Sequence, residues 1–190
     1  MPVRDRHLTR VVFHSILFFI FLNISAYAEE KRIEGNYFNI YYYYGLNPLE
    51  IAQRLDFSSP HLQIGTNYLK NGSNNPEAIL AKTLDALFLE VSDILDIHLY
   101  SFKGSLRILR DFKTLDSEFY KLYRMNLKAP SFYIYETNTI YISLDNLRVG
   151  ILGHEIAHAI MNNYFVVPPP MKLQEVLSGY VEYTLQKKSR

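Results

Sequence analysis

The sequence has 190 residues, of which 48% are hydrophobic and 21% charged, and its formal net charge is +1. This composition can build a buried core in one domain and excludes a globally disordered chain. The near-zero charge gives no electrostatic basis for a nucleic-acid partner, and the absence of cysteine excludes disulfides, thiolate metal sites and a cysteine nucleophile.

The first thirty residues have the features of an export signal. Three arginines within the first ten residues precede an apolar run from Val11 to Ile24, and Ala26-Tyr27-Ala28 follows as a small-x-small cleavage site. The run of about 14 residues is shorter than the ~20 that a membrane-spanning helix needs. We therefore predict a signal peptide at 1–28 and an exported domain at 29–190, either periplasmic or extracellular. The alternative is an uncleaved anchor, which alone would associate the domain with a membrane.

Hydrophobic periodicity and turn-forming residues predict the regular elements of the domain. In chain order, these are a strand at 37–44, a short helix at 48–57, a helix at 76–97, a strand at 105–112, a helix at 114–123, a hairpin of strands at 131–135 and 139–143, and helices at 149–164 and 171–186. Residues 58–75 are rich in Ser, Asn, Gly and Pro and predict a loop with a short extended piece at 61–64. The elements indicate an α+β fold, with a small mixed sheet packed against several helices.

The predicted helix at 149–164 carries His154-Glu155-Ile156-Ala157-His158, which is an HExxH motif. Residues four apart lie on one face of a helix, so the two imidazoles can bind one zinc ion from the same side. Glu155 is adjacent to the first of these ligands and is suited to act as the general base on a zinc-activated water. The alternative is a buried helix with two hydrogen-bonded histidines, but burying these polar groups without a partner would be costly.

Zinc needs a third protein ligand and, for catalysis, an open fourth position. Glu175 is the best candidate, because it lies on the last predicted helix, 17 positions after His158 and beyond Pro168-Pro169-Pro170. Glu182 either competes for that role or accepts a hydrogen bond from a ligating histidine.

The last predicted helix is expected to pack closely on the HExxH helix. Ser178 and Gly179 share the face of Glu175, and their small size would allow a close approach. Five further side chains are expected to supply the packing face: Leu173, Val176, Leu177, Tyr180 and Thr184.

These residues together resemble a gluzincin-type zincin, a metallopeptidase of the thermolysin superfamily with a peptidase MA-like domain. The resemblance rests on the HExxH motif, on residues 174–179 (QEVLSG), and on residues 137–143 (TNTIYIS) as the edge strand beside the active helix. It covers only the C-terminal part of the chain. It implies a zincin-like fold, a Zn²⁺ cofactor, hydrolysis of peptide bonds, and a peptide substrate that pairs with the edge strand.

The chain departs from the thermolysin pattern in two respects. Gly179 stands where those enzymes have an aspartate that orients a histidine. Because 15 residues follow Glu175, we expect a local group to stabilise the oxyanion. Candidates for this role, or for orienting a ligand, are Tyr180 and Tyr183, with Tyr164 and Tyr141 as further possibilities.

The sequence thus predicts an exported zinc metallopeptidase that acts on a peptide or protein substrate, with Glu155 as its general base. The alternative is a non-catalytic zinc-binding or interaction module that retains a zincin fold. An open cleft beside residues 139–143 would favour the enzyme. The sequence does not indicate the oligomeric state or the substrate.

Overall fold

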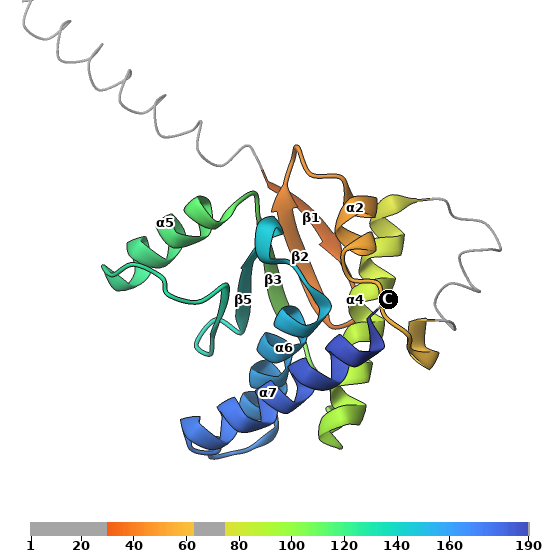
Figure 1. The fold of residues 1–190 in the computed structure, drawn as a ribbon, viewed down its shortest axis with the longest axis vertical. Helices are drawn as coiled ribbons and strands as arrows, with labels where there is room; N and C mark the ends of the chain where they lie inside the picture. The colour runs from red at the N-terminus through yellow and green to blue at the C-terminus, as the bar shows by residue number, and fades with distance from the viewer. Residues whose placement is uncertain (1–29, 63–74, 190) are drawn as a thin grey trace, which may run out of the picture. The chain divides into compact units, whose positions relative to one another are not determined.

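The computed structural model describes residues 30–62 and 75–189 (Figure 1). The chain divides into two compact units, residues 1–30 and 31–190, and the second contains the hydrophobic core. The signal peptide predicted at 1–28 lies outside the described residues. Among the described residues, no helix combines the length and the apolar character that crossing a bilayer requires.

A five-stranded mixed sheet forms the centre of the second unit, with strand order β1-β2-β3-β5-β4. The strands are β1 (Glu30–Glu34), β2 (Phe38–Tyr43), β3 (Gly104–Leu109), β4 (Ser131–Ile134) and β5 (Thr139–Ser143). β2, β3 and β5 pair in parallel, and β4 runs antiparallel to β5, as expected for the predicted hairpin. The predicted α+β class is confirmed. β1 is an addition to the predicted strands, because four of its five residues are charged and give no apolar alternation.

The edge of the sheet is formed by a different strand from the one predicted. Residues 139–143 were predicted to form the edge, but the strand that they form, β5, lies between β3 and β4. Ile140 of β5 is paired with Leu106 on one side and with Tyr133 on the other. β4 is therefore the edge strand at this end of the sheet, and β1 is the edge strand at the other. The sequence could not show this, because the parallel pairing of β5 with β3 joins segments that are far apart along the chain.

The four longer helices agree with the periodicity of the sequence to within two residues at each end, whereas the short helix predicted at 48–57 ends at Gln53. The helices are α2 (Pro48–Gln53), α4 (Pro76–Leu95), α5 (Phe112–Tyr123), α6 (Val149–Tyr164) and α7 (Met171–Lys188), and the 3-10 turn η1 (Leu144–Asn146) precedes α6. The side chains of Asn47 and Asn75 cap α2 and α4 by accepting hydrogen bonds from backbone N–H groups of the first turn. Residues 60–62 are helical, so the extended piece predicted at 61–64 is wrong over its first two residues.

Two hydrophobic clusters lie on opposite faces of the sheet. The larger one joins alternate residues of β2, β3 and β5 to α2, α4, α6 and α7. The smaller one joins Leu109, Leu115 and Leu127 to aromatic residues on α5, β4 and β5, with Phe132 and Tyr141 stacked 4.7 Å apart between their ring centroids. α6 therefore packs against one face of the sheet, with α7 on α6 and α4, and α5 covers the other face (Figure 1).

A close approach between α6 and α7 positions the candidate site. A Cβ atom added to Gly153 of α6 would lie only 2.1 Å from Cδ1 of Leu185 in α7. One added to Gly150 would lie 2.9 Å from Cγ of Gln186. The two helices can pack at this distance because α6 has no side chain at these two positions.

The face of α7 that packs on α6 differs from the predicted one. The buried residues of α7 are Gln174, Ser178, Val181 and Leu185. Of the residues predicted to pack, Leu173, Val176 and Tyr180 are exposed, and a Cβ added to Gly179 would have no atom within 4 Å. The small residues that matter for the approach are thus Ser178 and the glycines of α6.

Candidate metal centre

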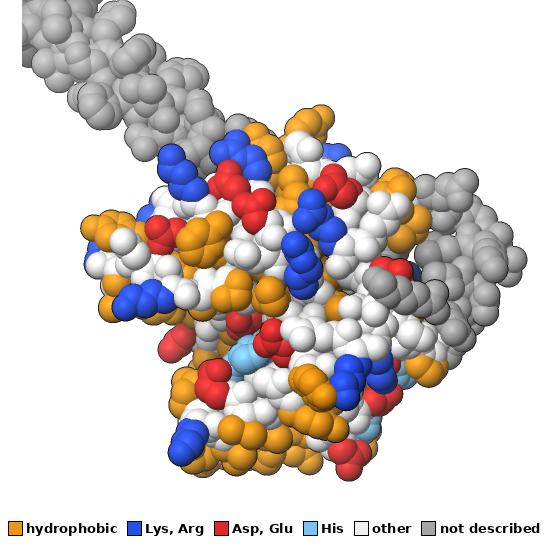
Figure 2. Space-filling view, in the orientation of Figure 1, with side chains coloured by type: hydrophobic (Ala, Val, Ile, Leu, Met, Phe, Trp, Pro, Cys, Tyr) orange, Lys and Arg blue, Asp and Glu red, His pale blue; other side chains and the backbone are white. Residues whose placement is uncertain are grey.

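α6 places the two histidines of the HExxH motif side by side. The Nε2 atoms of His154 and His158 are 3.2 Å apart, and their ring centroids are 5.0 Å apart. Both residues lie in an uninterrupted α-helix, so the four-residue spacing aligns them on one face. Figure 2 shows a histidine side chain reaching the surface between acidic side chains, where α6 and α7 meet.

α7 brings Glu175 to the two histidines. Its carboxylate oxygens lie 3.3 Å from His158 Nε2 and 3.6 Å from His154 Nε2. Ligand atoms bonded at 2.0–2.2 Å to a tetrahedral ion are roughly 3.3–3.6 Å apart. The two histidine nitrogens and the two oxygens of Glu175, separated by 3.2, 3.3 and 3.6 Å, lie close to that spacing. Among the described residues, His154, His158 and Glu175 form the group of histidine and acidic residues that could hold a metal ion.

Burial favours the metal-binding form of His158. Removal from water lowers the pKa of its imidazole, a change that the hydrogen bond with Gln174 and the nearby Glu175 carboxylate oppose. The adjacent imidazole of His154 lowers the same pKa further. A neutral imidazole has a free lone pair, which is what coordination of a metal requires.

Gln174 holds His158 in a defined orientation. Its side-chain Oε1 lies 3.2 Å from His158 Nδ1, so the Nδ1 proton can be donated to it while Nε2 faces Glu175. Gln174 is itself fixed, because it accepts a hydrogen bond from Asn162 and donates one to the carbonyl of Pro169. No role was predicted for Gln174, although residues 174–179 were part of the family resemblance. Its position directly before the predicted ligand Glu175 was the signal that could have identified it.

His154 lies beside the carboxylate of Glu182, a residue that the sequence predicts as a ligand or as an acceptor for a ligating histidine. Glu182 Oε2 lies 3.2 Å from His154 Nδ1, whereas the group of three possible ligands does not include Glu182. Of its two predicted roles, the position beside the histidine is therefore the one that the structure favours. The Nδ1 atom is fully buried and, among the described residues, has no partner with hydrogen-bond geometry. A cation bound at Nε2 would strengthen the attraction between the Nδ1–H group and the Glu182 carboxylate.

Glu155 faces the interior and is held by the edge strand. The Ser131 hydroxyl of β4 donates a 2.7 Å hydrogen bond to Glu155 Oε1, and both side chains are buried. Burial raises the pKa of Glu155, and this hydrogen bond opposes the change. Nothing local in the sequence links these two residues, which are 24 positions apart on separate elements.

The tyrosines considered from the sequence lie elsewhere. Tyr180 and Tyr183 are exposed on α7, and the ammonium of Lys187 lies 4.3 Å from the ring centroid of Tyr183. Tyr141 belongs to the cluster beneath α5, and the ring of Tyr164 packs edge-on against Phe165. No contact between these hydroxyls and the three ligands is recorded in the described part of the chain, so the structure assigns no oxyanion group among them.

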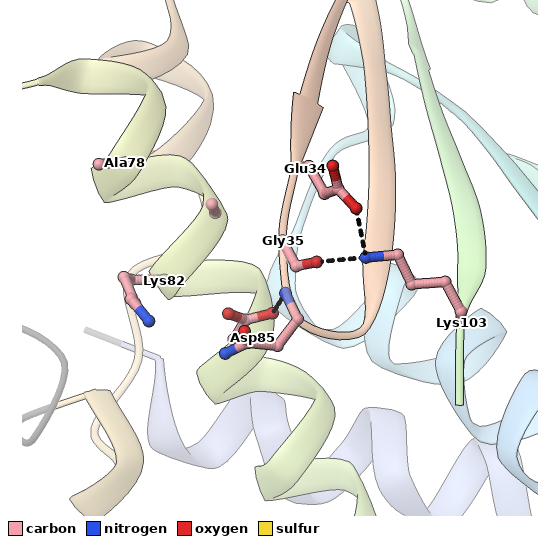
Figure 3. Close-up of a pocket in the computed structure, with 8 residues that line it drawn as sticks. Glu34, Gly35, Ala78, Lys82, Asp85 and Lys103 are labelled. Atoms are coloured by element: carbon pink, nitrogen blue, oxygen red, sulfur yellow. Dashed lines mark hydrogen bonds and ion pairs between the residues drawn. The ribbon is translucent and has the colours of Figure 1, made fainter. Parts of the chain in front are cut away.

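Two cavities lie outside the three-residue cluster. One, of about 400 Å³, borders Glu182 and is lined by Arg54, Arg148 and the first turn of α6. The other, of about 430 Å³, lies between α4 and the β1–β2 turn (Figure 3).

The polar groups of the second cavity bond to one another. Asp85 accepts hydrogen bonds from the backbone N–H groups of Asn36 and Tyr37, and Lys103 donates to the carbonyl of Gly35 and contacts Glu34 (Figure 3). These contacts hold the β1–β2 turn against α4 and β3, so the polar residues that line this cavity have a structural role.

Comparison of the chain with known protein families, with curated proteins and with solved structures gave no match. The chemistry of the cluster itself is therefore the guide to function. Two imidazole nitrogens and one carboxylate form a donor set that suits zinc, and the thiolates that other zinc sites use are absent from this chain.

Proposed function

We propose that this protein is an exported, zinc-dependent metallopeptidase of the gluzincin type. The observation that carries the proposal is the convergence of His154, His158 and Glu175, whose ligand atoms all lie within 4.8 Å of one another, close enough to share one ion. Sites with three protein ligands of this kind leave a fourth position for water or substrate. Export is supported by the signal-like sequence at 1–28.

Each residue of the site would have a separate role in the reaction. Bound zinc would polarise a substrate carbonyl and lower the pKa of a water molecule to about 7. Glu155 would accept the proton of that water and return it to the leaving amine. Ser131 would hold Glu155 in place, and Gln174 and Glu182 would orient the two histidines.

The peptide substrate would bind along β4. This strand is the edge of the sheet, so the side facing away from β5 can pair with an extended chain. Ser131 belongs to β4 and donates to Glu155, which brings the edge strand next to the proposed general base. A peptide added to this edge would therefore lie beside the cluster.

A second function, metal binding without turnover, is favoured by one observation. Glu155 is only 8% exposed, and one of its oxygens already accepts the Ser131 hydrogen bond. A glutamate held in this way could serve the packing of α6 against β4 instead of proton transfer. The zinc site would then stabilise the fold, as structural metal sites do.

The deciding experiment measures metal content and peptide hydrolysis for residues 29–190. Glu155→Gln removes the proton acceptor but none of the three ligands, and Glu136→Gln, at an exposed turn, is the matched control. An enzymatic function predicts one zinc per chain in all three proteins. It also predicts chelator-sensitive hydrolysis by the wild type and the control, but none by Glu155→Gln. Zinc binding without hydrolysis of a broad peptide library would favour the second function, and absence of stoichiometric zinc would reject both.

A further inference from the structure

Exposed apolar side chains are concentrated on the outer side of α7 and on the segment that precedes it. Nine of the 17 large hydrophobic side chains exposed in the described residues lie between positions 164 and 183. They are Tyr164, Phe165, Val166, Val167, Met171, Leu173, Val176, Tyr180 and Tyr183. At roughly 100–150 Å² each they present on the order of 1,000 Å², whereas the largest apolar patch on a typical monomer is about 300–600 Å². The excess indicates that something covers this surface.

Four of these side chains form a continuous stripe along the helix. Leu173, Val176, Tyr180 and Tyr183, here called the α7 stripe, are 48 to 62% exposed. Their spacing of three, four and three residues is that of the a and d positions of a coiled coil. The stripe lies on the side of α7 away from its buried residues, and Lys172 and Lys187 are the charged residues at its ends.

The α7 stripe is complementary to itself. A two-fold axis passing near Ser178 and perpendicular to the helix would place Leu173 opposite Tyr183 of a second copy. The same axis would place Val176 opposite Tyr180. Each aliphatic side chain then meets an aromatic one, and every contact occurs twice, as an isologous interface requires. We propose that two copies of this protein associate through antiparallel pairing of their α7 helices.

The available area is sufficient for such a dimer. A standard interface buries about 800 Å² on each partner, and the stripe together with Met171 and the exposed residues 164–167 offers at least that much. A lipid surface fits less well. Helices that bind at a membrane interface carry many basic residues on their polar face, whereas the basic residues of α7 are three lysines near its two ends, Lys172, Lys187 and Lys188.

The proposal does not depend on the metal centre. The ligand Glu175 and its neighbour Glu182 face α6, whereas the α7 stripe points away from it. Failure of zinc binding would therefore leave the dimer intact, and a monomeric protein could still bind zinc.

The first test is the oligomeric state of residues 29–190, measured by sedimentation equilibrium over a range of concentrations. We expect twice the monomer mass, and Tyr180→Glu should weaken association at least about 30-fold, as loss of a central interface residue typically does. Tyr100→Glu is the matched control, because Tyr100 is fully exposed and lies outside the surface. A protein that stays monomeric at several hundred micromolar overturns the proposal, as does a dimer that Tyr180→Glu leaves unchanged.

The second test determines the direction of pairing and uses the absence of cysteine from the chain. In an antiparallel dimer, a mixture of Val176→Cys and Tyr180→Cys should form disulfide-linked dimers faster than either variant alone. Faster linking of each variant with itself indicates parallel helices and overturns the antiparallel interface. A monomer that floats with vesicles containing anionic phosphatidylglycerol identifies a membrane as the occupant and also overturns the proposal.

Discussion

The two helices that form the candidate metal centre distribute their polar and apolar side chains in opposite ways. α6 is buried from Val149 to Met161 over most of its surface, and its polar residues there belong to the HExxH motif. α7 turns the polar residues Gln174 and Ser178 towards α6 and exposes its apolar stripe. The comparison shows that the glycines of α6 can set the position of α7. The inward face of α7 can then carry residues of the site, and its outward face remains available to a partner.

The largest expected effect comes from removing one ligand from each helix. His158→Ala on α6 and Glu175→Ala on α7 should each weaken zinc binding more than about 100-fold, because loss of a group that only orients a ligand already costs about 10–100-fold. Competition with a chromophoric chelator measures both affinities. His98→Ala, at an exposed histidine outside the cluster, should leave the affinity unchanged. Unchanged affinity in the Glu175 variant would show that α7 does not belong to the centre.

The contact between the two helices can be tested with a pair of glycines. Gly153→Ala places a methyl group 2.1 Å from Leu185 in the core, and overpacking of this kind costs about 1–3 kcal/mol. Gly179→Ala meets no atom within 4 Å, so it should stabilise the helix by up to about 1 kcal/mol. Urea unfolding of the two variants measures both changes. Two changes of the same sign would contradict the close approach described here.

The inward polar face of α7 can be tested at Gln174. Gln174→Met keeps the length of the side chain but removes the acceptor for His158 Nδ1 and the donor to Pro169. We expect zinc affinity to fall about 10–100-fold, because the imidazole is no longer held in the tautomer that exposes Nε2. Gln53→Met, at an exposed position of α2, is the control. An affinity equal to that of the control would mean that the burial of Gln174 serves packing alone.

The smallest effect concerns α5, which has the side-chain N-cap that α6 and α7 lack. Hydrogen bonds from the hydroxyl and the N–H of Thr114, and then Arg110, lower the pKa of Asp111 to about 2. The unfolded chain binds this proton near pH 4, so the stabilisation is present above that pH and is lost as the pH falls through about 2.

Two substitutions at Asp111 separate the cap from its charge. Asp111→Ala should reduce the free energy of unfolding at pH 7 by about 1 kcal/mol. Asp111→Asn should retain most of the capping. It should lose the part of the pH dependence of the free energy of unfolding that Asp111 contributes between pH 4 and 2. Denaturation curves at several pH values measure both effects, and an identical pH dependence in the wild type and Asp111→Asn would contradict the assignment.

Local information in the sequence was enough to predict much of the fold. α6 begins and ends at the residues predicted, and α4, α5 and α7 differ from prediction by one or two residues at their ends. The strands of the β4–β5 hairpin were also predicted, because β-prone runs and turn residues are features of adjacent positions. β1 could not be found in this way, because a mostly charged edge strand has no hydrophobic alternation.

The contacts of the site depend on residues that are far apart along the chain. The 24-residue separation between Ser131 and Glu155 leaves no local pattern. Glu182, in contrast, was predicted from the sequence to act as a ligand or beside a ligating histidine, and it lies 3.2 Å from His154 Nδ1. The face of α7 was predicted wrongly because it, too, depends on distant residues. Its apolar residues suggested a packing surface, but the close contact made possible by Gly153 determined which side faces α6.

The sequence by itself determined the class of the fold, the extent of the main helices and the chemistry of the HExxH motif, because these depend on neighbouring residues and on helical spacing. Only the tertiary structure decided that Glu175 reaches both histidines, that β4 is the edge strand, and that α7 presents its apolar residues outward. These outcomes follow from how whole elements pack against one another. Packing is set by side-chain volume and shape at contacts between distant segments, and no single segment contains that information.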